Sequence, residues 1–380
     1  MKKIRVCLTG GATGGHFFPL IFVARELKKI SQEKNFKIEI FYIGGEPFDK
    51  KLMEEEGIRV YIIPSFKLRR YFDIKNFFDF LKAPFSFLLS FFYMFLLMPD
   101  VLFSKGGPSS IAVVFSAWFF RIPILIHDSD SVPGLANRIS AKFARKVALA
   151  FPSAQKYFSS KEVVIVGQPI DERIIYTPIT QEDYERFHLN KDEKIILILG
   201  GSQGSQFLNE IIIEILPQLL KISQVVHLTG KKFFQEAYSY ALGIIRRNSP
   251  LEEKKYKAFP FLNNEDNLIL MKMSDLIISR AGSSSIFEIA ALGKPSILIP
   301  LPEDVVGSHQ KENAYYLQKI GACYVLEEAN VKPHLLLNLI QSILKDEELK
   351  EKMGKNALNF YKPHAARKIA EEILVLAQFK

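Results

Sequence analysis

One structural unit occurs twice in this sequence. The apolar stretch Ile4–Thr9 runs into the glycine-rich segment 9–16, TGGATGGH, and about 190 residues later Lys194–Leu199 runs into 200–204, GGSQG. An apolar, helix-like segment follows in both cases. A strand, a glycine turn and a helix in this order are the opening of a βαβ unit with a parallel sheet. The chain therefore begins such a sheet twice.

Short apolar runs and longer amphipathic segments alternate after both turns, as in buried parallel strands joined by helices. In the first half we predict strands at Ile4–Thr9, Lys37–Ile43, Val101–Ser104 and Pro123–His127, and helices at Leu20–Ile30, Phe48–Gly57 and Leu135–Phe143. In the second half we predict strands at Lys194–Leu199, Gln224–Leu228, Leu276–Ser279 and Ser296–Pro300, and a helix at Leu208–Ile222. The predicted fold class is α/β, with two doubly wound parallel-sheet domains.

The length of 380 residues also suits two domains, because a single core rarely grows beyond about 250–300 residues. A proline-containing and then polar stretch at 167–191 is the predicted linker. We place the domains at 1–167 and 168–362. The amphipathic helix expected within 363–380 could pack back on the first of them.

The composition narrows the kind of partner. The chain has 50 Lys and Arg against 41 Asp and Glu, a net charge of +9, which favours nucleic acid, phospholipid or a phosphorylated substrate. Cys7 and Cys323 give neither a disulfide framework nor a metal-site spacing, as expected in a reducing cytosol. The amino-terminal segment reads as a strand and not as an export signal, because Arg5 interrupts its apolar run.

One segment suggests contact with a membrane. Residues 83–99 read APFSFLLSFFYMFLLMP and carry no charge, but they are shorter than the ~20 residues of a typical transmembrane helix. Five cations precede this segment: Lys67, Arg69, Arg70, Lys75 and Lys82. We expect a helix that lies partly in the core and partly against a bilayer surface.

Both glycine loops suit a bound phosphate, because glycine lets the backbone approach an anion and the next helix presents N–H groups to it. The first loop lacks the dinucleotide fingerprint, since Ala12 stands at its second glycine. The second also matches the G-x-S-x-G of α/β-hydrolases, and Ser202, Asp275 and His309 follow in an order that permits a catalytic triad. A hydrolase sheet, however, does not restart halfway along a chain.

Two further polar turns follow predicted strands of the second half. The first reads SRAGSSSIFE over 279–288. There Ser283–Ser285 are predicted to cap a helix and bind phosphate, with Glu288 in the first turn holding a ribose diol. Taken alone, these residues fit a plain helix cap better. The other turn reads SHQKENA, in which Gln310 and Asn313 share a helix face, and neutral amides suit sugar hydroxyls.

Together these segments resemble the MurG family, the N-acetylglucosaminyltransferases that convert lipid I to lipid II in peptidoglycan synthesis. The similar stretches run in family order along nearly the whole chain: GGATGGHFFPL, KLRRYF, KGGPSS, IPILIHDSDSVPGLANR, GGSQG with Asn209, AFPFLNNEDNLILMKMSDLIISRAGSSSIFEIAALGKPSILIP and HQKENA. The resemblance implies a GT-B fold, two Rossmann-like domains facing across a cleft. It also implies inverting transfer of GlcNAc from UDP-GlcNAc to the C4 hydroxyl of lipid I.

The resemblance places the donor site in the C-terminal domain, with Leu262 recognising uracil, Glu288 on the ribose and Gln310 on the GlcNAc hydroxyls. The implied donor residues are Ser202, Leu262, Arg280, Ser283, Ser284, Ser285, Ile286, Phe287, Glu288, Gln310 and Asn313. The implied acceptor residues are Thr13, Gly14, Gly15 and Asp130. His16 and Asp128 are both candidates for the general base: His16 ordinarily titrates near neutrality, whereas Asp128 would need a raised pKa or would only orient the acceptor.

Three departures from the family concern these sites. Asp128 and Asp130 stand where the family usually has Glu and Asn, and a carboxylate at 130 cannot donate hydrogen bonds as an amide does. Pro108 replaces the tyrosine of a GGY motif. Asp171 replaces an arginine, for which Arg173 could substitute.

The expected partners are UDP-GlcNAc, lipid I and an anionic membrane surface, without nucleic acid, at the cytoplasmic face of a bacterial membrane. No cofactor or metal is expected, because helix N-termini and serines can stabilise the leaving UDP. Three alternatives stay open: the serine hydrolase, a UDP-GlcNAc 2-epimerase of the same fold, and a non-catalytic protein whose HDSD loop has lost activity. The Phe-rich basic segment argues against the epimerase.

Overall fold

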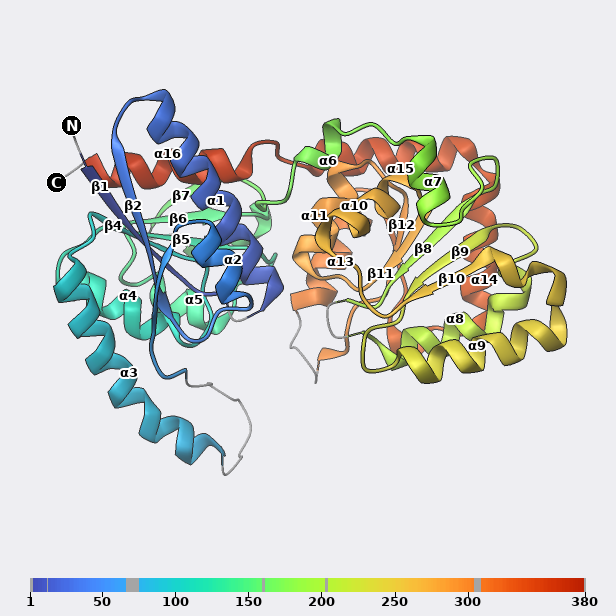
Figure 1. The fold of residues 1–380 in the computed structure, drawn as a ribbon, viewed down its shortest axis with the longest axis horizontal. Coiled ribbons are helices and arrows are strands. Elements are labelled where there is room, and N and C mark those ends of the chain that lie inside the picture. Colours follow the sequence, from blue (N-terminus) through green and yellow to red (C-terminus); the bar gives the residue numbers. More distant parts are fainter. Residues whose placement is uncertain are drawn as a thin grey trace. The chain divides into compact units, whose positions relative to one another are not determined.

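The structure is a computed structural model and describes residues 3–11, 13–65, 75–158, 161–201, 204–303 and 309–378, with only the backbone at 75–81, 174 and 378. The chain forms two compact units, Met1–Ile170 with Lys362–Lys380, and Asp171–Tyr361. Each unit holds one parallel sheet covered by helices (Figure 1). The predicted α/β class with two parallel-sheet domains is therefore confirmed.

The first unit is built on a seven-stranded sheet. Its strand order is β3 (Arg59–Ile62), β2 (Lys37–Gly44), β1 (Lys3–Thr9), β4 (Val101–Ser104), β5 (Ile124–Asp128), β6 (Lys146–Leu149) and β7 (Glu162–Ile165). All neighbouring strands are parallel, and Val6 of β1 lies opposite both Ile40 and Val101. The sheet reverses its winding between β1 and β4, so the loops after these two strands diverge to opposite faces.

Helices cover both faces of this sheet. They are α1 (Gly14–Glu33), α2 (Lys50–Glu55), α3 (Lys75–Leu97), α4 (Ser110–Phe119), α5 (Leu135–Ser140) and α16 (Ala365–Gln378). Alternate residues of a strand point to opposite faces: Val6 packs in the core cluster with α1 and α16, and Cys7 packs in the cluster with α3 and α4. Figure 1 shows α16 (red) in the same unit as the blue strands β1 and β2.

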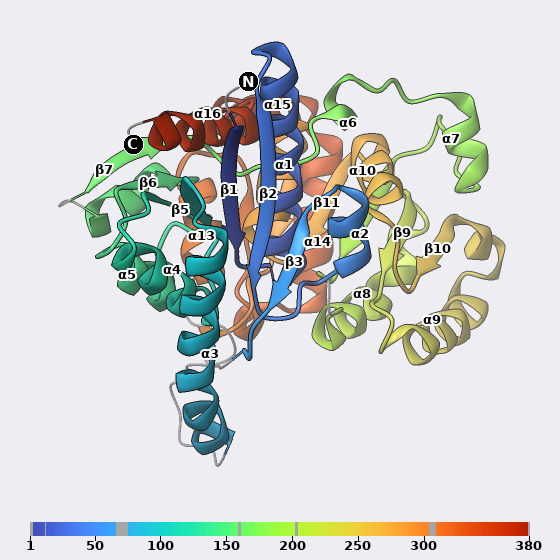
Figure 2. The same ribbon diagram turned by 60° about the vertical axis from the view of Figure 1, so that its left-hand side comes forward.

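The uncharged segment 83–99 forms most of α3, which begins earlier than predicted, at Lys75. Ser86, Ser90 and Met94 recur at helical spacing on its buried face, whereas its other face exposes large apolar side chains. In Figures 1 and 2 its amino-terminal half extends beyond the other elements of its unit. In the part of the chain that the structure describes, no helix has the length and apolarity needed to cross a membrane.

The second unit repeats the design with six parallel strands. Their order is β10 (Tyr256–Phe259), β9 (Gln224–Leu228), β8 (Ile195–Leu199), β11 (Leu276–Ser279), β12 (Ser296–Leu298) and β13 (Tyr324–Val325). The helices are α6 (Arg173–Tyr176), α7 (Gln181–Arg186), α8 (Gln206–Leu219), α9 (Phe234–Asn248), α10 (Asn264–Met273), α11 (Ser283–Ala291), α13 (His309–Lys319), α14 (Pro333–Lys345) and α15 (Glu347–Phe360). Figure 2 shows α8 and α9 beside β9 and β10.

Candidate active site

Loops after three neighbouring strands meet at the carboxyl edge of the first sheet. The N–H of Lys105, after β4, donates to the Thr9 carbonyl at the end of β1 over 2.9 Å. A Cβ atom on Gly10 would lie only 3.0 Å from the Gly106 carbonyl oxygen, and Gly10 has φ +116°. Only glycine suits such a position. Ligands of open parallel sheets bind at this edge, where the strand order reverses.

The amino terminus of α1 opens onto this edge. The helix begins at Gly14, its N-cap residue Thr13 makes no side-chain capping bond, and no acidic residue lies in its first turn. The first helical hydrogen bonds are donated by His16 and Phe17, so the N–H groups of Gly14 and Gly15 precede them. Such groups, with the helix dipole, favour an anion. Thr13 Oγ1 lies 3.1 Å from His16 Nδ1.

Asp128 is held rigidly at the end of β5. Its side chain is 1% exposed, one oxygen accepts from the Asp130 N–H at 3.0 Å and the other from the Asn137 amide at 2.8 Å. Burial, and then the negative charge of Asp130, raise the pKa of Asp128 to about 6. This carboxyl group therefore meets the requirement of a raised pKa.

His16 behaves differently from the expectation. Its ring is partly exposed, but the protein around it and the positive charge of Lys105 lower its pKa to about 4, with Asp130 opposing the shift. The expected titration near neutrality is therefore wrong. His16 is a neutral imidazole at pH 7.

Two side chains at this edge were not among the site residues predicted from the sequence. Lys105 is 1% exposed, and its ammonium donates to the Ser129 hydroxyl and, over 3.4 Å, to Gln168. Asn137 holds Asp128, and a Cβ on Gly106 would lie 2.4 Å from the Asn137 side-chain oxygen. Both residues lie in the family-like stretches KGGPSS and IPILIHDSDSVPGLANR, but no chemical motif marks either of them as a site residue.

A second set of loops meets at the carboxyl edge of the other sheet. Ser202 lies outside the described residues. Beside it, Gly204 has φ +74°, and a Cβ there would lie 2.6 Å from the Thr229 carbonyl oxygen. Ser205 then caps α8 by accepting from the Leu208 N–H at 3.1 Å. The loop is thus drawn tightly against the end of β9.

Arg280 joins the loops of this edge. Arg280 is 5% exposed, and its guanidinium donates to the Ser205 hydroxyl, to Glu328 at 2.8 Å and to the Ile299 carbonyl at 3.1 Å. An arginine committed to three loops positions them. Arg280 was predicted to bind substrate. Its described contacts indicate instead that it holds the loops of the site in place.

Helix α11 starts one residue earlier than a serine cap requires. Gly282 is the N-cap residue, no side chain caps the helix, and no acidic residue lies in its first turn. The predicted serine cap is wrong, because Gly282 takes the extended cap conformation and Ser283–Ser285 become the first three helical residues. Glu288 lies in the second turn instead of the first. The N–H groups of residues 283–285 precede the first helical hydrogen bond, donated by Ile286.

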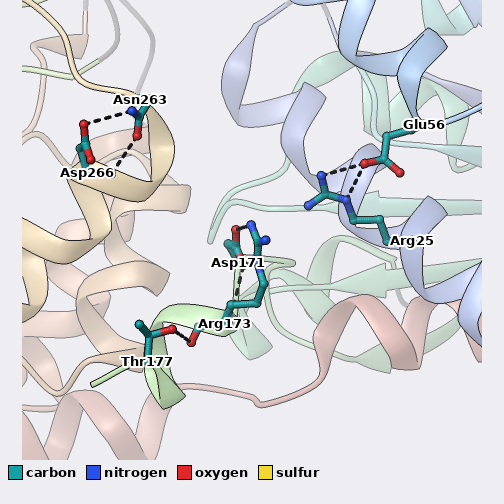
Figure 3. A network of polar contacts seen from close by, with 7 residues as sticks. All are labelled: Arg25, Glu56, Asp171, Arg173, Thr177, Asn263 and Asp266. Atoms are coloured by element: carbon teal, nitrogen blue, oxygen red, sulfur yellow. Dashed lines mark hydrogen bonds and ion pairs between the residues drawn. The ribbon is translucent and has the colours of Figure 1, made fainter. Parts of the chain in front are cut away.

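Glu288 lies near a second carboxylate. Burial, and then the charge of Asp171, raise the pKa of the partly exposed Glu288 to about 8. Arg173 binds Asp171 through two bonds, from Nε at 2.8 Å and from Nη2 at 2.5 Å (Figure 3). The guanidinium of Arg173 is therefore occupied by Asp171. This argues against Arg173 as a substitute for the arginine with which the family contacts the ligand.

The other predicted donor residues fall into two groups. Leu262, between β10 and α10, and Gln310, at the start of α13, are partly exposed, and Gln310 accepts from the Leu301 N–H at 3.2 Å. The side chains of Ile286, Phe287 and Asn313 are fully buried. For these three, a direct side-chain contact with a sugar would require the core to open, so they support the site from within.

The hydrolase triad is excluded by the strand direction. Asp275 accepts from the Ile195 N–H at 2.8 Å, at the amino end of β8. The glycine loop whose sequence contains Ser202 follows the carboxyl end of the same five-residue strand, and a strand of five residues at ~3.3 Å each spans roughly 16 Å. No group of three His, Cys, Asp or Glu side chains that could hold a metal ion occurs among the described residues.

The comparisons with known proteins agree along the chain. The N-terminal domain of glycosyltransferase family 28 matches residues 6–149, and its C-terminal domain matches residues 195–373. A UDP-N-acetylglucosamine–N-acetylmuramyl-(pentapeptide) pyrophosphoryl-undecaprenol N-acetylglucosamine transferase of Clostridium kluyveri is 37% identical over 90% of this chain and 91% of its own. The chain belongs to the MurG family. A Bacillus cereus transferase of the same description is 36% identical, over 94% of this chain and 97% of its own.

Solved structures place the MurG family chain in the GT-B fold. Acinetobacter baumannii MurG has a TM-score of 0.73 at 24% identity, covering 98% of this chain and all of its own. A putative UDP-N-acetylglucosamine 2-epimerase of Listeria monocytogenes has a TM-score of 0.72 at 12% identity, covering 100% and 98%. The backbone alone fits both families equally, so the epimerase is a fold neighbour. The sequence identity decides for the MurG family.

Proposed function

We propose that this chain transfers N-acetylglucosamine from UDP-GlcNAc to the C4 hydroxyl of lipid I, which yields lipid II for cell-wall biogenesis and so serves cell shape and division. The observation that carries the proposal is the identity of 36–37% to transferases over 90–94% of the chain, across both units. Each unit also contributes a glycine loop and a helix amino terminus at the carboxyl edge of its sheet.

In this proposal the unit Asp171–Tyr361 holds the donor. The loop after β8 and the amino terminus of α11 bind the diphosphate, because their N–H groups and dipole favour an anion. Glu288 binds the ribose, the backbone at Leu262 recognises uracil, and Gln310 binds the GlcNAc hydroxyls. Arg280 fixes the positions of the segments that contain Ser205 and Glu328 by donating a hydrogen bond to each.

The chemical step needs a base and a stabilised leaving group. The acceptor C4 oxygen attacks the anomeric carbon, the bond from that carbon to the UDP oxygen breaks in line, and the configuration inverts. The C4 proton passes to Asp128, a stronger base than His16 because its pKa is about 6 and that of His16 about 4. The helix dipole of α11 stabilises the negative charge that develops on UDP.

The test is a transfer assay on the purified chain with UDP-GlcNAc and a lipid I analogue. We expect UDP release that depends on the acceptor, with a disaccharide product in the β configuration. UDP release without acceptor, or conversion of the donor to its 2-epimer, would overturn the proposal in favour of the epimerase. A lack of turnover with bound UDP-GlcNAc would favour the non-catalytic protein.

Chelation should leave the transfer rate unchanged. Helix dipoles and hydroxyls would stabilise the leaving UDP, and an ammonium group, that of Lys105, already faces Asp128 and Asp130. The measurement is UDP release in EDTA, with and without added Mg²⁺. If EDTA stopped turnover and Mg²⁺ restored it, Asp128 and Asp130 would have to be tested as metal ligands.

We also propose that the first unit binds the cytoplasmic face of an anionic membrane, since the lipid tail of the acceptor stays in the bilayer. Exposed apolar side chains gather on α3 and α4: Phe85, Leu88, Phe92, Phe95, Leu96, Trp118 and Phe119. The two helices pack together through aromatic contacts such as Phe91 with Phe119, whose ring centroids lie 5.0 Å apart. An exposed apolar surface of this kind is typical of a membrane or protein contact. Lys82 is exposed beside it; Lys67, Arg69 and Arg70 lie outside the described residues, as does the side chain of Lys75.

Binding to anionic vesicles should therefore have two components. The cations contribute up to about 1 kcal/mol each, and salt should weaken this part, since the screening length falls from ~10 Å at 0.1 M to ~3 Å at 1 M. The apolar component should resist salt. In co-sedimentation, changing Lys67, Arg69 and Arg70 to Glu should lower binding at low salt only.

A second variant tests the apolar component of vesicle binding. Phe92→Ser with Phe95→Ser should weaken binding at both salt levels by at least about tenfold, because a buried Phe contributes roughly 1.5–3 kcal/mol. Leu251→Ser, at a still more exposed apolar position of the other unit, is the control and should bind as the unchanged chain does. Equal binding by the Phe variant and this control would remove α3 from the proposal.

A further inference from the structure

Lys105 stands out among the buried side chains because it is charged. It is 1% exposed and belongs to the largest fully buried side chains of the described chain. An isolated ammonium in such a place is costly, so buried lysines are retained where charges or hydrogen bonds compensate them. Burial lowers the pKa of Lys105 to about 8, and the charges of Asp128 and Asp130 oppose that shift.

The surroundings of Lys105 come from three segments that are far apart in sequence: residues 9–16, 127–130 and 168. Its backbone bonds to Thr9 at the end of β1, and its ammonium donates to Ser129 after β5 and to Gln168 after β7. The titratable groups that face it are His16 from α1, His127 from β5, and the carboxyl groups of Asp128 and Asp130. Both imidazoles have lowered pKa values, so the charged neighbours at pH 7 are the two carboxyl groups.

We propose that Lys105 is a positioning residue for the transfer step: its ammonium fixes the loop 127–130 through Ser129 and keeps the Asp128 carboxylate ionised for proton removal. This inference rests on the proposed function of Asp128 as the base. The negative charge of Asp130, two residues away, raises the pKa of the buried Asp128 carboxyl. The charge of the Lys105 ammonium opposes this shift, so that Asp128 is available as a base at neutral pH.

The charge-removing variants are Lys105→Met and Lys105→Gln. The first has nearly the same length, and the second keeps a polar contact with Ser129 should the first fold poorly. Loss of a cation near a carboxylate raises its pKa by about 1–3 units. We therefore expect the acid limb of the kcat profile to move at least about one unit to higher pH, and kcat at pH 6 to fall about fivefold or more.

Two further variants separate charge from packing. Ser129→Ala removes the contact and keeps the ammonium, so the acid limb should stay within a few tenths of a unit. Asp130→Asn added to Lys105→Met removes one negative charge, so the limb should move back toward that of the unchanged chain. A purely structural Lys105 would lower kcat and the unfolding temperature without moving the limb and without compensation at Asp130. That outcome would overturn the inference.

A second readout does not depend on turnover. The Asp128 carboxyl resonance, assigned in ¹³C-aspartate-labelled protein by its loss in Asp128→Asn, should titrate at higher pH in both Lys105 variants. The affinity for UDP-GlcNAc should stay unchanged, since the donor residues lie in the other unit. If the unchanged chain shows no transfer but the resonance shifts, the proposed function fails and the electrostatic part of the inference stands. If transfer occurs and the resonance does not shift, the inference fails alone.

Discussion

Replacing Asp128 by Asn should reduce kcat by about 10²–10⁴-fold, the usual contribution of a positioned general base. The asparagine has the same shape but cannot take the C4 proton at neutral pH. The unchanged chain should show kcat falling below pH 6, because the pKa of Asp128 is raised to about 6 and only the ionised form accepts the proton. The acid limb should be absent from the residual activity of the variant.

The control for this prediction is Asp130→Asn, which restores the amide that the family usually carries there. The charge of Asp130 raises the pKa of Asp128, so its removal should move the acid limb to lower pH. UDP-GlcNAc binding should stay the same in both variants. A full rate in Asp128→Asn would instead assign the role of base to His16. In that case His16→Ala would have to abolish the transfer activity.

Replacing Glu288 by Ala should weaken UDP-GlcNAc binding by about 10- to 150-fold above pH 8, where the carboxyl group is ionised. Hydrogen bonds from the two ribose hydroxyls to a charged carboxylate contribute about 1.5–3 kcal/mol, and every 1.4 kcal/mol is about tenfold. The pKa of Glu288 is raised to about 8, so the carboxyl is mostly protonated at pH 7. Donor affinity should therefore rise with pH up to about 8, as the ionised form becomes available.

Glu288→Gln is the matched variant, because it keeps the size of the side chain and removes its titration. It should bind the donor with little dependence on pH, whereas the unchanged chain tightens between pH 6.5 and 8.5. Calorimetric titration with UDP-GlcNAc measures both effects. An unchanged dissociation constant in Glu288→Ala would remove this residue from the donor site.

The sequence predicted the strands whose residues are mainly apolar. Val101–Ser104, Gln224–Leu228 and Leu276–Ser279 lie where the apolar pattern placed them. The strands that it missed are short and begin with charged or polar residues: β3, β6, β7, β10 and β13. Val101–Ser104 and Leu276–Ser279 are equally short, but each begins with apolar residues. In the missed segments, pairing with a neighbour already in the sheet decides whether a strand forms.

The site was predictable where it depends on local chemistry. The glycine turns and the polar segments after strands were found, because each needs only its own residues to be recognised. Lys105 was not, since a lysine is ordinarily exposed and its burial results from strand ends near residues 9, 129 and 168. The turn of α11 in which Glu288 lies depends on whether Gly282 or a serine is the N-cap residue. The usual preference for serine at the N-cap predicts the wrong residue here.

The position of α16 has a consequence for synthesis on the ribosome. Ile369, Ala370, Ile373 and Leu374 complete the core beside Val6 and Leu8, yet they are translated roughly 200 residues after the rest of their unit. At about 5–20 residues per second, the first sheet waits roughly 10–40 s for its last helix. During that interval an apolar face of α1 and β1 stays uncovered, which makes the nascent chain a client for chaperones. The second unit, continuous in sequence, has no such delay and can finish folding first.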